Sequence, residues 1–112
     1  MTTIYHNPRC SKSHQTLALL GEHGIEPEVI EYLETPPSAA ELKEILNMLG
    51  IAPRDLLRKK EAREAGLNDP DMGDDALIEA MAANPIVIER PIVVNNGKAA
   101  LGRPPESVVD IL

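Results

Sequence analysis

The chain has 112 residues and a formal net charge of −7, with a single cysteine and no phenylalanine or tryptophan. A chain of this length can bury about two-thirds of its unfolded surface, which predicts one domain with a modest core. The acidic balance and the scarcity of aromatic side chains exclude the basic, base-stacking surface that binds nucleic acids. One cysteine cannot form an intramolecular disulfide, and the N-terminus lacks the pattern of a signal peptide. We therefore expect a cytoplasmic protein that does not bind nucleic acid or membrane.

The first third of the chain predicts a strand, a helix and a second strand. Residues 2–6 form the expected first strand, and the helix is expected over 11–23 because Gly24 commonly ends helices. Residues 27–33 have the β-branched and aromatic content of another strand. A strand, a crossover helix and a strand form a βαβ unit, whose right-handed crossover makes the two strands parallel.

The middle of the chain is predicted to be helical. A helix is expected over 38–48 because Ser38 and Glu41 have the spacing of a capping box. A short helix is expected to begin at Pro53, since proline is favoured at the first helical position. A further helix is capped by Asp74 or the next aspartate.

Two strands and a last helix are predicted for the C-terminal part. The Asn-Gly signal within 95–98 joins Val93 and Val94 to residues 99–101 as an antiparallel pair. A final helix begins near Pro104. This order of elements indicates an α/β fold with a small mixed four-stranded sheet and a helical insertion at about residues 38–83.

Cys10 lies at the junction between the first strand and the first helix. If the helix begins at or just after Cys10, its first N–H groups and its dipole favour the thiolate. An unpaired cysteine often behaves as a small buried hydrophobe, but the polar and cationic neighbours of Cys10 favour a reactive thiol. His6 either hydrogen-bonds near this thiol or packs at the end of the strand.

Two of the six arginines occur in rigid, weakly solvated contexts. Arg90 lies between apolar residues and before Pro91, and Arg103 lies between a glycine and a proline. A planar guanidinium group suits a tetrahedral oxyanion, although each arginine could instead cap a carbonyl or pair with a glutamate. For Arg58, which lies in a run of charges, a solvated role or an ion pair is the stronger alternative.

Several other kinds of site are excluded by spacing. A phosphatase-type loop needs an arginine six residues after the cysteine, where this chain has Thr16. The three histidines do not have metal-ligand spacing, and one cysteine cannot build a structural zinc site. We therefore expect no metal.

Five motifs, in the same order along the chain, resemble the ArsC-type, glutaredoxin-coupled arsenate reductases, in a short form similar to the YfgD-like members. The motifs are Tyr5–Ser13, Tyr32–Glu34 with Pro36–Pro37, Leu56–Lys59, Glu89–Val94 and Leu101–Glu106. The resemblance implies a thioredoxin-like fold, with residues 1–112 as one domain.

The resemblance also implies roles for individual residues. Cys10 would be the nucleophile, and the substrate oxyanion would be bound by Arg58, Arg90 and Arg103. The Arg90–Pro91 peptide bond would be cis, and the supporting residues would be His6, Ser13 and Pro91.

The implied reaction is the reduction of arsenate to arsenite, a step in arsenic detoxification. Reduction takes two electrons, and a lone thiol cannot form an internal disulfide, so external thiols are needed. The resemblance names them as glutathione, a co-substrate, and glutaredoxin, a protein partner, with no bound cofactor. We expect a monomer, the default for so small a domain. One alternative is a glutathione-dependent thiol oxidoreductase without arsenate specificity. Another is a non-enzymatic, Spx-like RNA-polymerase-binding regulator, although such regulators usually carry a second cysteine where this chain has Ser13.

Overall fold

The chain builds a first folded unit, leaves it after Thr35 and returns to it at Arg90. The computed structural model describes residues 2–112. Its second unit is the intervening segment Pro36–Glu89. The expected helical insertion at 38–83 falls within this segment, and a single domain over 1–112 stays a prediction.

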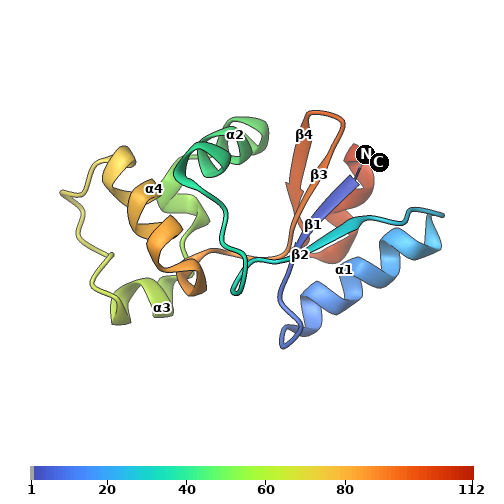
Figure 1. Ribbon diagram of the computed structural model, residues 1–112, viewed down its shortest axis with the longest axis horizontal. Helices are drawn as coiled ribbons and strands as arrows, with labels where there is room; N and C mark the ends of the chain where they lie inside the picture. The colour runs from blue at the N-terminus through green and yellow to red at the C-terminus, as the bar shows by residue number, and fades with distance from the viewer. Residues whose placement is uncertain (1) are drawn as a thin grey trace. The chain divides into compact units, whose positions relative to one another are not determined.

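The first unit contains a four-stranded mixed sheet in the order β2-β1-β3-β4 (Figure 1). Its strands are β1 (Thr2–His6), β2 (Glu28–Glu31), β3 (Ile92–Asn95) and β4 (Lys98–Leu101). Strand β1 pairs in parallel with β2 and antiparallel with β3. The predicted βαβ unit is therefore confirmed, and so is the four-stranded mixed sheet.

The turn between β3 and β4 is built by Asn96 and Gly97. Their φ angles are 51° and 81°, both in the left-handed region. A two-residue hairpin turn of type I′ needs positive φ at both positions, which asparagine and glycine tolerate best. The antiparallel hairpin predicted from this dipeptide is confirmed.

Two helices cover one face of the sheet in the first unit. They are α1 (Ser11–Glu22) and the 3₁₀ helix η3 (Pro105–Ile111). Their residues Leu20 and Val108 join Ile4 and Val93 of the sheet in a fully buried cluster. The last helix is tighter than the regular helix that the sequence favoured, with an i to i+3 bond from the Ser107 N–H to the Pro104 carbonyl at 3.0 Å.

The second unit is made of short helices. They are α2 (Ala39–Leu49), η1 (Pro53–Leu56), α3 (Lys59–Glu64), α4 (Asp74–Ala83) and η2 (Pro85–Val87). The predicted capping box is present, because the Glu41 N–H donates to Ser38 Oγ and the Ser38 N–H donates to Glu41 Oε1. Gly50 ends α2 in the left-handed conformation. The cap of α4 is Gly73 and not an aspartate, and the two aspartates lie in its first turn.

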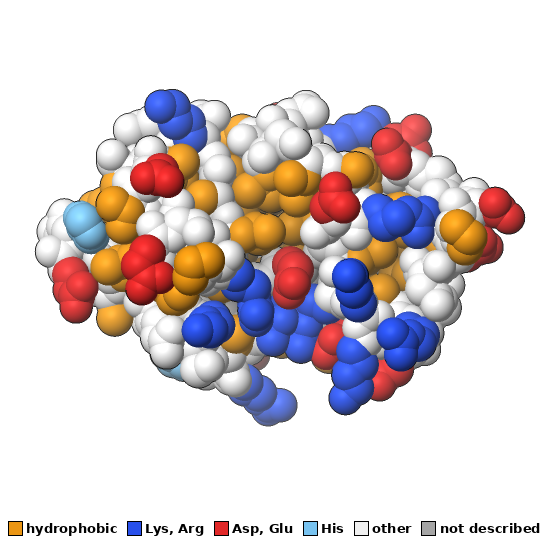
Figure 2. Space-filling view, turned by 180° about the vertical axis from the view of Figure 1, so that it is seen from behind, with side chains coloured by type: hydrophobic (Ala, Val, Ile, Leu, Met, Phe, Trp, Pro, Cys, Tyr) orange, Lys and Arg blue, Asp and Glu red, His pale blue; other side chains and the backbone are white. Residues whose placement is uncertain are grey.

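The surface is mixed in character. Acidic, basic and hydrophobic side chains are interspersed on the face shown in Figure 2. Among residues 2–112, the exposed large hydrophobic residues are Val29, Leu33, Ile86 and Leu112. Within residues 2–112, no helix combines the length and the hydrophobicity needed to cross a membrane.

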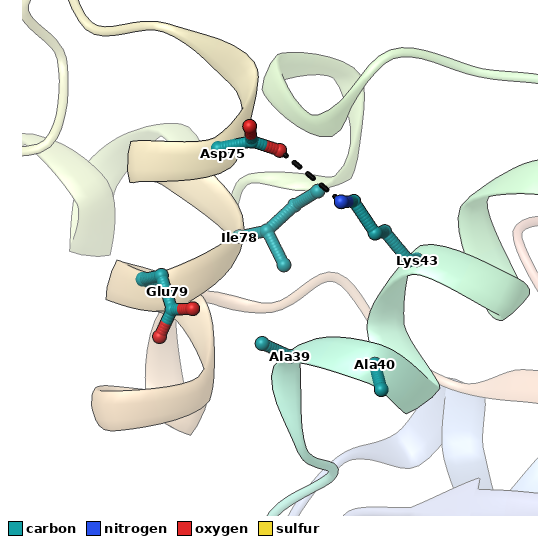
Figure 3. Close-up of a pocket in the computed structure, with 6 residues that line it drawn as sticks. All are labelled: Ala39, Ala40, Lys43, Asp75, Ile78 and Glu79. Atoms are coloured by element: carbon teal, nitrogen blue, oxygen red, sulfur yellow. Dashed lines mark ion pairs between the residues drawn. The ribbon is translucent and has the colours of Figure 1, made fainter.

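The second unit has a cavity of about 390 Å³ between α2 and α4 (Figure 3). An ion pair of 3.4 Å joins Lys43 Nζ to Asp75 across it, with the side chains 62% and 85% exposed. Such an exposed pair contributes little to stability. The lining residues include no cysteine, serine, threonine or histidine: they are Ala39, Ala40, Lys43, Asp75, Ile78 and Glu79.

Candidate active site

Cys10 is the N-cap residue of α1, with extended backbone angles. Its N–H donates to the Asn7 carbonyl at 3.0 Å, and its carbonyl accepts from the His14 N–H at 3.1 Å. The residue is buried, with 8% of its surface exposed. The helix thus begins directly after Cys10, as the sequence predicted, and the free N–H groups of the first turn lie at the thiol.

The pKa of the Cys10 thiol is lowered from its ordinary value. Burial is the largest single influence and acts in the opposite direction, because it disfavours the charged thiolate. It is outweighed by backbone hydrogen bonds and positive charges that favour the thiolate, supplied in decreasing order by Ser13 (N–H), Arg90 (charge), Lys12 (N–H) and Arg103 (charge). A larger thiolate fraction at neutral pH makes Cys10 a better nucleophile.

Arg103 approaches the thiol directly. Its Nη2 lies 3.8 Å from Cys10 Sγ, and its Nε donates to the Arg90 carbonyl at 2.8 Å. The two arginines come from segments before β3 and after β4, which the hairpin brings to one end of the sheet. The structure therefore places both predicted arginines in the electrostatic environment of the predicted nucleophile.

The peptide bonds before Pro91 and Pro104 are both cis. The first confirms the expectation drawn from the family resemblance, and the second was not predicted. Pro91 is buried, and its carbonyl accepts a hydrogen bond from the Gly102 N–H at 2.9 Å. This bond ties the segment that carries Arg90 to the segment that carries Arg103.

Gly102 is a positioning residue that the sequence reasoning missed. A Cβ atom there would overlap the Oγ1 atom of Thr16 and lie 2.7 Å from Pro91 Cγ. Thr16 is fully buried in α1, and its hydroxyl donates to the Lys12 carbonyl. Only a residue without a side chain lets the segment next to Arg103 approach α1 this closely. A glycine directly before the arginine of a Gly-Arg-Pro sequence was the available signal.

His6 and Ser13 form a buried polar pair behind the Cys10 loop. His6 Nδ1 lies 2.6 Å from Ser13 Oγ, which also accepts the Asn7 N–H at 3.0 Å. Burial and the charge of His14 lower the pKa of His6, and Glu31 partly offsets them. Both interpretations of His6 hold in part, since its ring is buried at the end of β1 and bonds a residue whose N–H donates to the Cys10 sulfur.

Arg58 belongs to the second unit, where it precedes α3. Its Nη2 forms a 2.7 Å ion pair with Glu61, and its Nη1 donates to the Ile86 carbonyl at 3.4 Å. These contacts match the alternative in which Arg58 forms an ion pair within its own unit. A role for Arg58 in binding the substrate of Cys10 stays a prediction.

The sequence profile of the ArsC family matches residues 5–111. The chain belongs to the ArsC family. It is 56% identical to the protein YfgD of Escherichia coli strain K12, over 97% of this chain and 94% of that one. It is 52% identical to an arsenate reductase of Neisseria meningitidis, over 97% of this chain and 96% of that one. A solved structure of an arsenate reductase from Vibrio cholerae has a TM-score of 0.95 and 54% identity, over 99% of this chain and 97% of that one.

The predicted thioredoxin-like α/β fold is confirmed for this ArsC-family chain. Its first unit holds six of the seven predicted site residues, which are Cys10, Arg90, Arg103, His6, Ser13 and Pro91. Their arrangement offers a thiolate beside two guanidinium groups. That combination can bind a tetrahedral oxyanion and attack its central atom.

Proposed function

We propose that this ArsC-family protein is an arsenate reductase that reduces arsenate to arsenite with glutathione and glutaredoxin as reductants. The observation that carries the proposal is the Cys10 thiol of lowered pKa, 3.8 Å from the Arg103 guanidinium and within the field of Arg90. The family, and relatives named arsenate reductase at about half identity, support arsenate as the oxyanion.

Binding of the anion depends on local charge. The chain as a whole carries a net charge of −7, so its long-range field does not attract an anion. Arg103 is exposed and presents a planar fork of N–H donors, which matches the edge of a tetrahedral oxyanion. We assign Arg90 and Arg103 to this binding role, with Arg58 as a third ligand on the strength of the family resemblance.

Catalysis begins when the Cys10 thiolate attacks arsenic. An As–S bond forms, an As–O bond breaks, and the oxygen leaves as water after taking up protons. A glutathione thiol then replaces a second oxygen, which also leaves as water. A glutaredoxin thiolate then attacks the glutathione sulfur and forms a disulfide with it. The bond between arsenic and the glutathione sulfur breaks, and its electron pair stays on arsenic, which becomes As(III). Water then cleaves the Cys10–As bond, releasing arsenite and the thiol.

The overall reaction converts one arsenate and two thiols into one arsenite, one disulfide and one water. Cys10 is the only cysteine of the chain, so both electrons come from outside. The cytoplasm maintains the reduced glutathione and glutaredoxin that this reaction consumes, and we place the protein there as a monomer.

The test is arsenite formation by the purified protein with glutathione and glutaredoxin. Wild type is expected to release arsenite, and Cys10→Ser is expected to release none, because a serine hydroxyl is not ionised at neutral pH. The matched control is Ser11→Ala, a change next to the nucleophile at an exposed position. Wild-type rates in Cys10→Ser would overturn the proposal. A wild-type protein that reduces glutathionylated proteins but not arsenate would replace it with the thiol oxidoreductase alternative.

A further inference from the structure

His14 contacts two residues that precede Cys10 in the chain. It lies in the first turn of α1, and its Nε2 atom is 2.5 Å from the Pro8 carbonyl oxygen. Its ring also meets the His6 ring edge to face, with centroids 4.9 Å apart and planes at 87°. None of the catalytic steps above uses His14, so these contacts call for a separate explanation.

The hydrogen bond to Pro8 has a defined direction. A carbonyl oxygen can only accept, so His14 Nε2 carries the proton and donates it. This is true of the neutral Nε2–H tautomer and of the charged imidazolium. The bond joins residues six apart in the chain and closes a loop of backbone that contains Cys10. This bond holds the loop against the first turn of α1.

The contact with His6, which is buried at the end of β1, supports the same loop. Edge-to-face geometry at this separation is the favourable arrangement for two rings. His6 in turn lies 2.6 Å from Ser13 Oγ, which accepts the Asn7 N–H. The Ser13 N–H donates to the Cys10 sulfur. His14 is therefore connected to the thiol through one side-chain network and one backbone bond.

We propose that His14 is a positioning residue for Cys10, which acts through Pro8 and His6 to hold the sulfur at the N–H groups that begin α1. The proposal rests on the proposed function only in taking Cys10 as the nucleophile. His14 does not touch the sulfur or the arginines in any contact described above, so its effect is on the geometry of the thiol and not on anion binding.

Charge adds to this mechanical role. Burial lowers the pKa of His6 most, the charge of His14 lowers it further, and Glu31, which is opposite His6 in the sheet, raises it. The cation Arg9 is carried by the same loop as Pro8. The net effect is a lowered His6 pKa, which favours the neutral ring, and the Nδ1 atom of a neutral ring can accept a hydrogen bond from the Ser13 hydroxyl.

The test compares His14→Leu with His14→Gln by the rate of Cys10 alkylation with iodoacetamide as a function of pH. Leucine removes the donor to Pro8, so the sulfur should leave the N–H groups and its pKa should rise. Below that pKa the alkylation rate is expected to fall about fivefold. Glutamine keeps an N–H donor of similar reach, and most of the rate is expected to return. His23→Leu, at the exposed end of α1, is the matched control and should behave as wild type.

Because His14 is exposed, replacing it leaves the core intact, and the melting temperature of each variant checks this. A His14→Leu protein that melts like wild type and has the wild-type pH profile would overturn the proposal. So would a His14→Gln protein that recovers none of the rate. Alkylation needs no arsenate, so failure of the arsenate reductase proposal would leave these results unchanged. Where arsenate is reduced, kcat should fall in His14→Leu while the KM for arsenate stays constant.

Discussion

At the scale of single residues, the site is a balance between burial and compensating donors at Cys10. Burial alone would keep the thiol protonated and unreactive. Two backbone N–H groups reverse this because the helix begins directly after the cysteine, and two arginines reverse it because the β3–β4 hairpin returns the chain to the same end of the sheet. The reactivity of Cys10 is therefore produced by its surroundings and not by the residue type.

The pH dependence of stability should report this balance. A thiol whose folded-state pKa is lowered stabilises the fold fully above its unfolded pKa, and this contribution is lost as the pH falls through the folded pKa. Wild type should therefore gain stability relative to Cys10→Ser between about pH 6 and about pH 9, across the ordinary thiol pKa of about 8.5. Denaturant unfolding of both proteins at the two pH values measures the difference. A difference that is constant or shrinks with pH would contradict the lowered pKa.

Replacing Arg103 should lower kcat/KM for arsenate more than replacing any exposed arginine outside the site. A charge-assisted hydrogen bond contributes about 1.5–3 kcal/mol, so Arg103→Ala should lower kcat/KM for arsenate by at least about tenfold. Arg103→Lys keeps the charge but loses the planar fork, and should recover only part of the activity. Arg63→Ala, an exposed arginine at the end of α3, is the control and should change little. Equal losses at Arg63 and Arg103 would contradict the assignment.

At the scale of elements, the sequence predicted a helix cap and a turn that depend on residues close together in the chain. The capping box at Ser38 and the Asn-Gly turn are local rules, and each is present in the structure. The 3₁₀ form of η3 and the close approach of Gly102 to Thr16 depend on segments far apart in the chain. For the same reason the sequence could nominate the arginines of the site but could not give their distances from the sulfur.

Gly102 affects both the packing of its segment against α1 and the position of Arg103 at the thiol. Gly102→Ala introduces a methyl group that overlaps Thr16 and crowds Pro91, and overpacking of this kind costs about 1–3 kcal/mol. Displacing the segment should also move Arg103 from the thiol and lower arsenate reduction. The matched control is Gly21→Ala in α1, where an added Cβ has no atom within 4 Å. This substitution should stabilise the helix by about 0.5–1 kcal/mol. Thermal unfolding of both variants decides; a Gly102→Ala protein as stable as wild type would show that the segment can relax.

At the scale of the whole molecule, the chain divides its chemistry unevenly between two folded units. The first unit contains the nucleophile, two arginines and the residues that position them. The second contributes one predicted site residue, Arg58, which is paired with Glu61. Whether the helical unit takes part in catalysis therefore depends on this arginine.

Arg58 provides the decisive measurement, because substrate binding and thiol reactivity can be tested separately. If Arg58 binds the oxyanion, Arg58→Ala should lower kcat/KM for arsenate by about tenfold or more, the loss expected for one charge-assisted hydrogen bond. The groups that lower the Cys10 pKa all belong to the first unit, so alkylation of the thiol should keep its wild-type rate. Glu61→Gln controls for loss of the ion pair with Arg58, and its kcat/KM should be near that of wild type. If Arg58→Ala and Glu61→Gln were equally impaired, the ion pair and not the arginine would be what activity requires, and Arg58 would be a structural residue of the second unit.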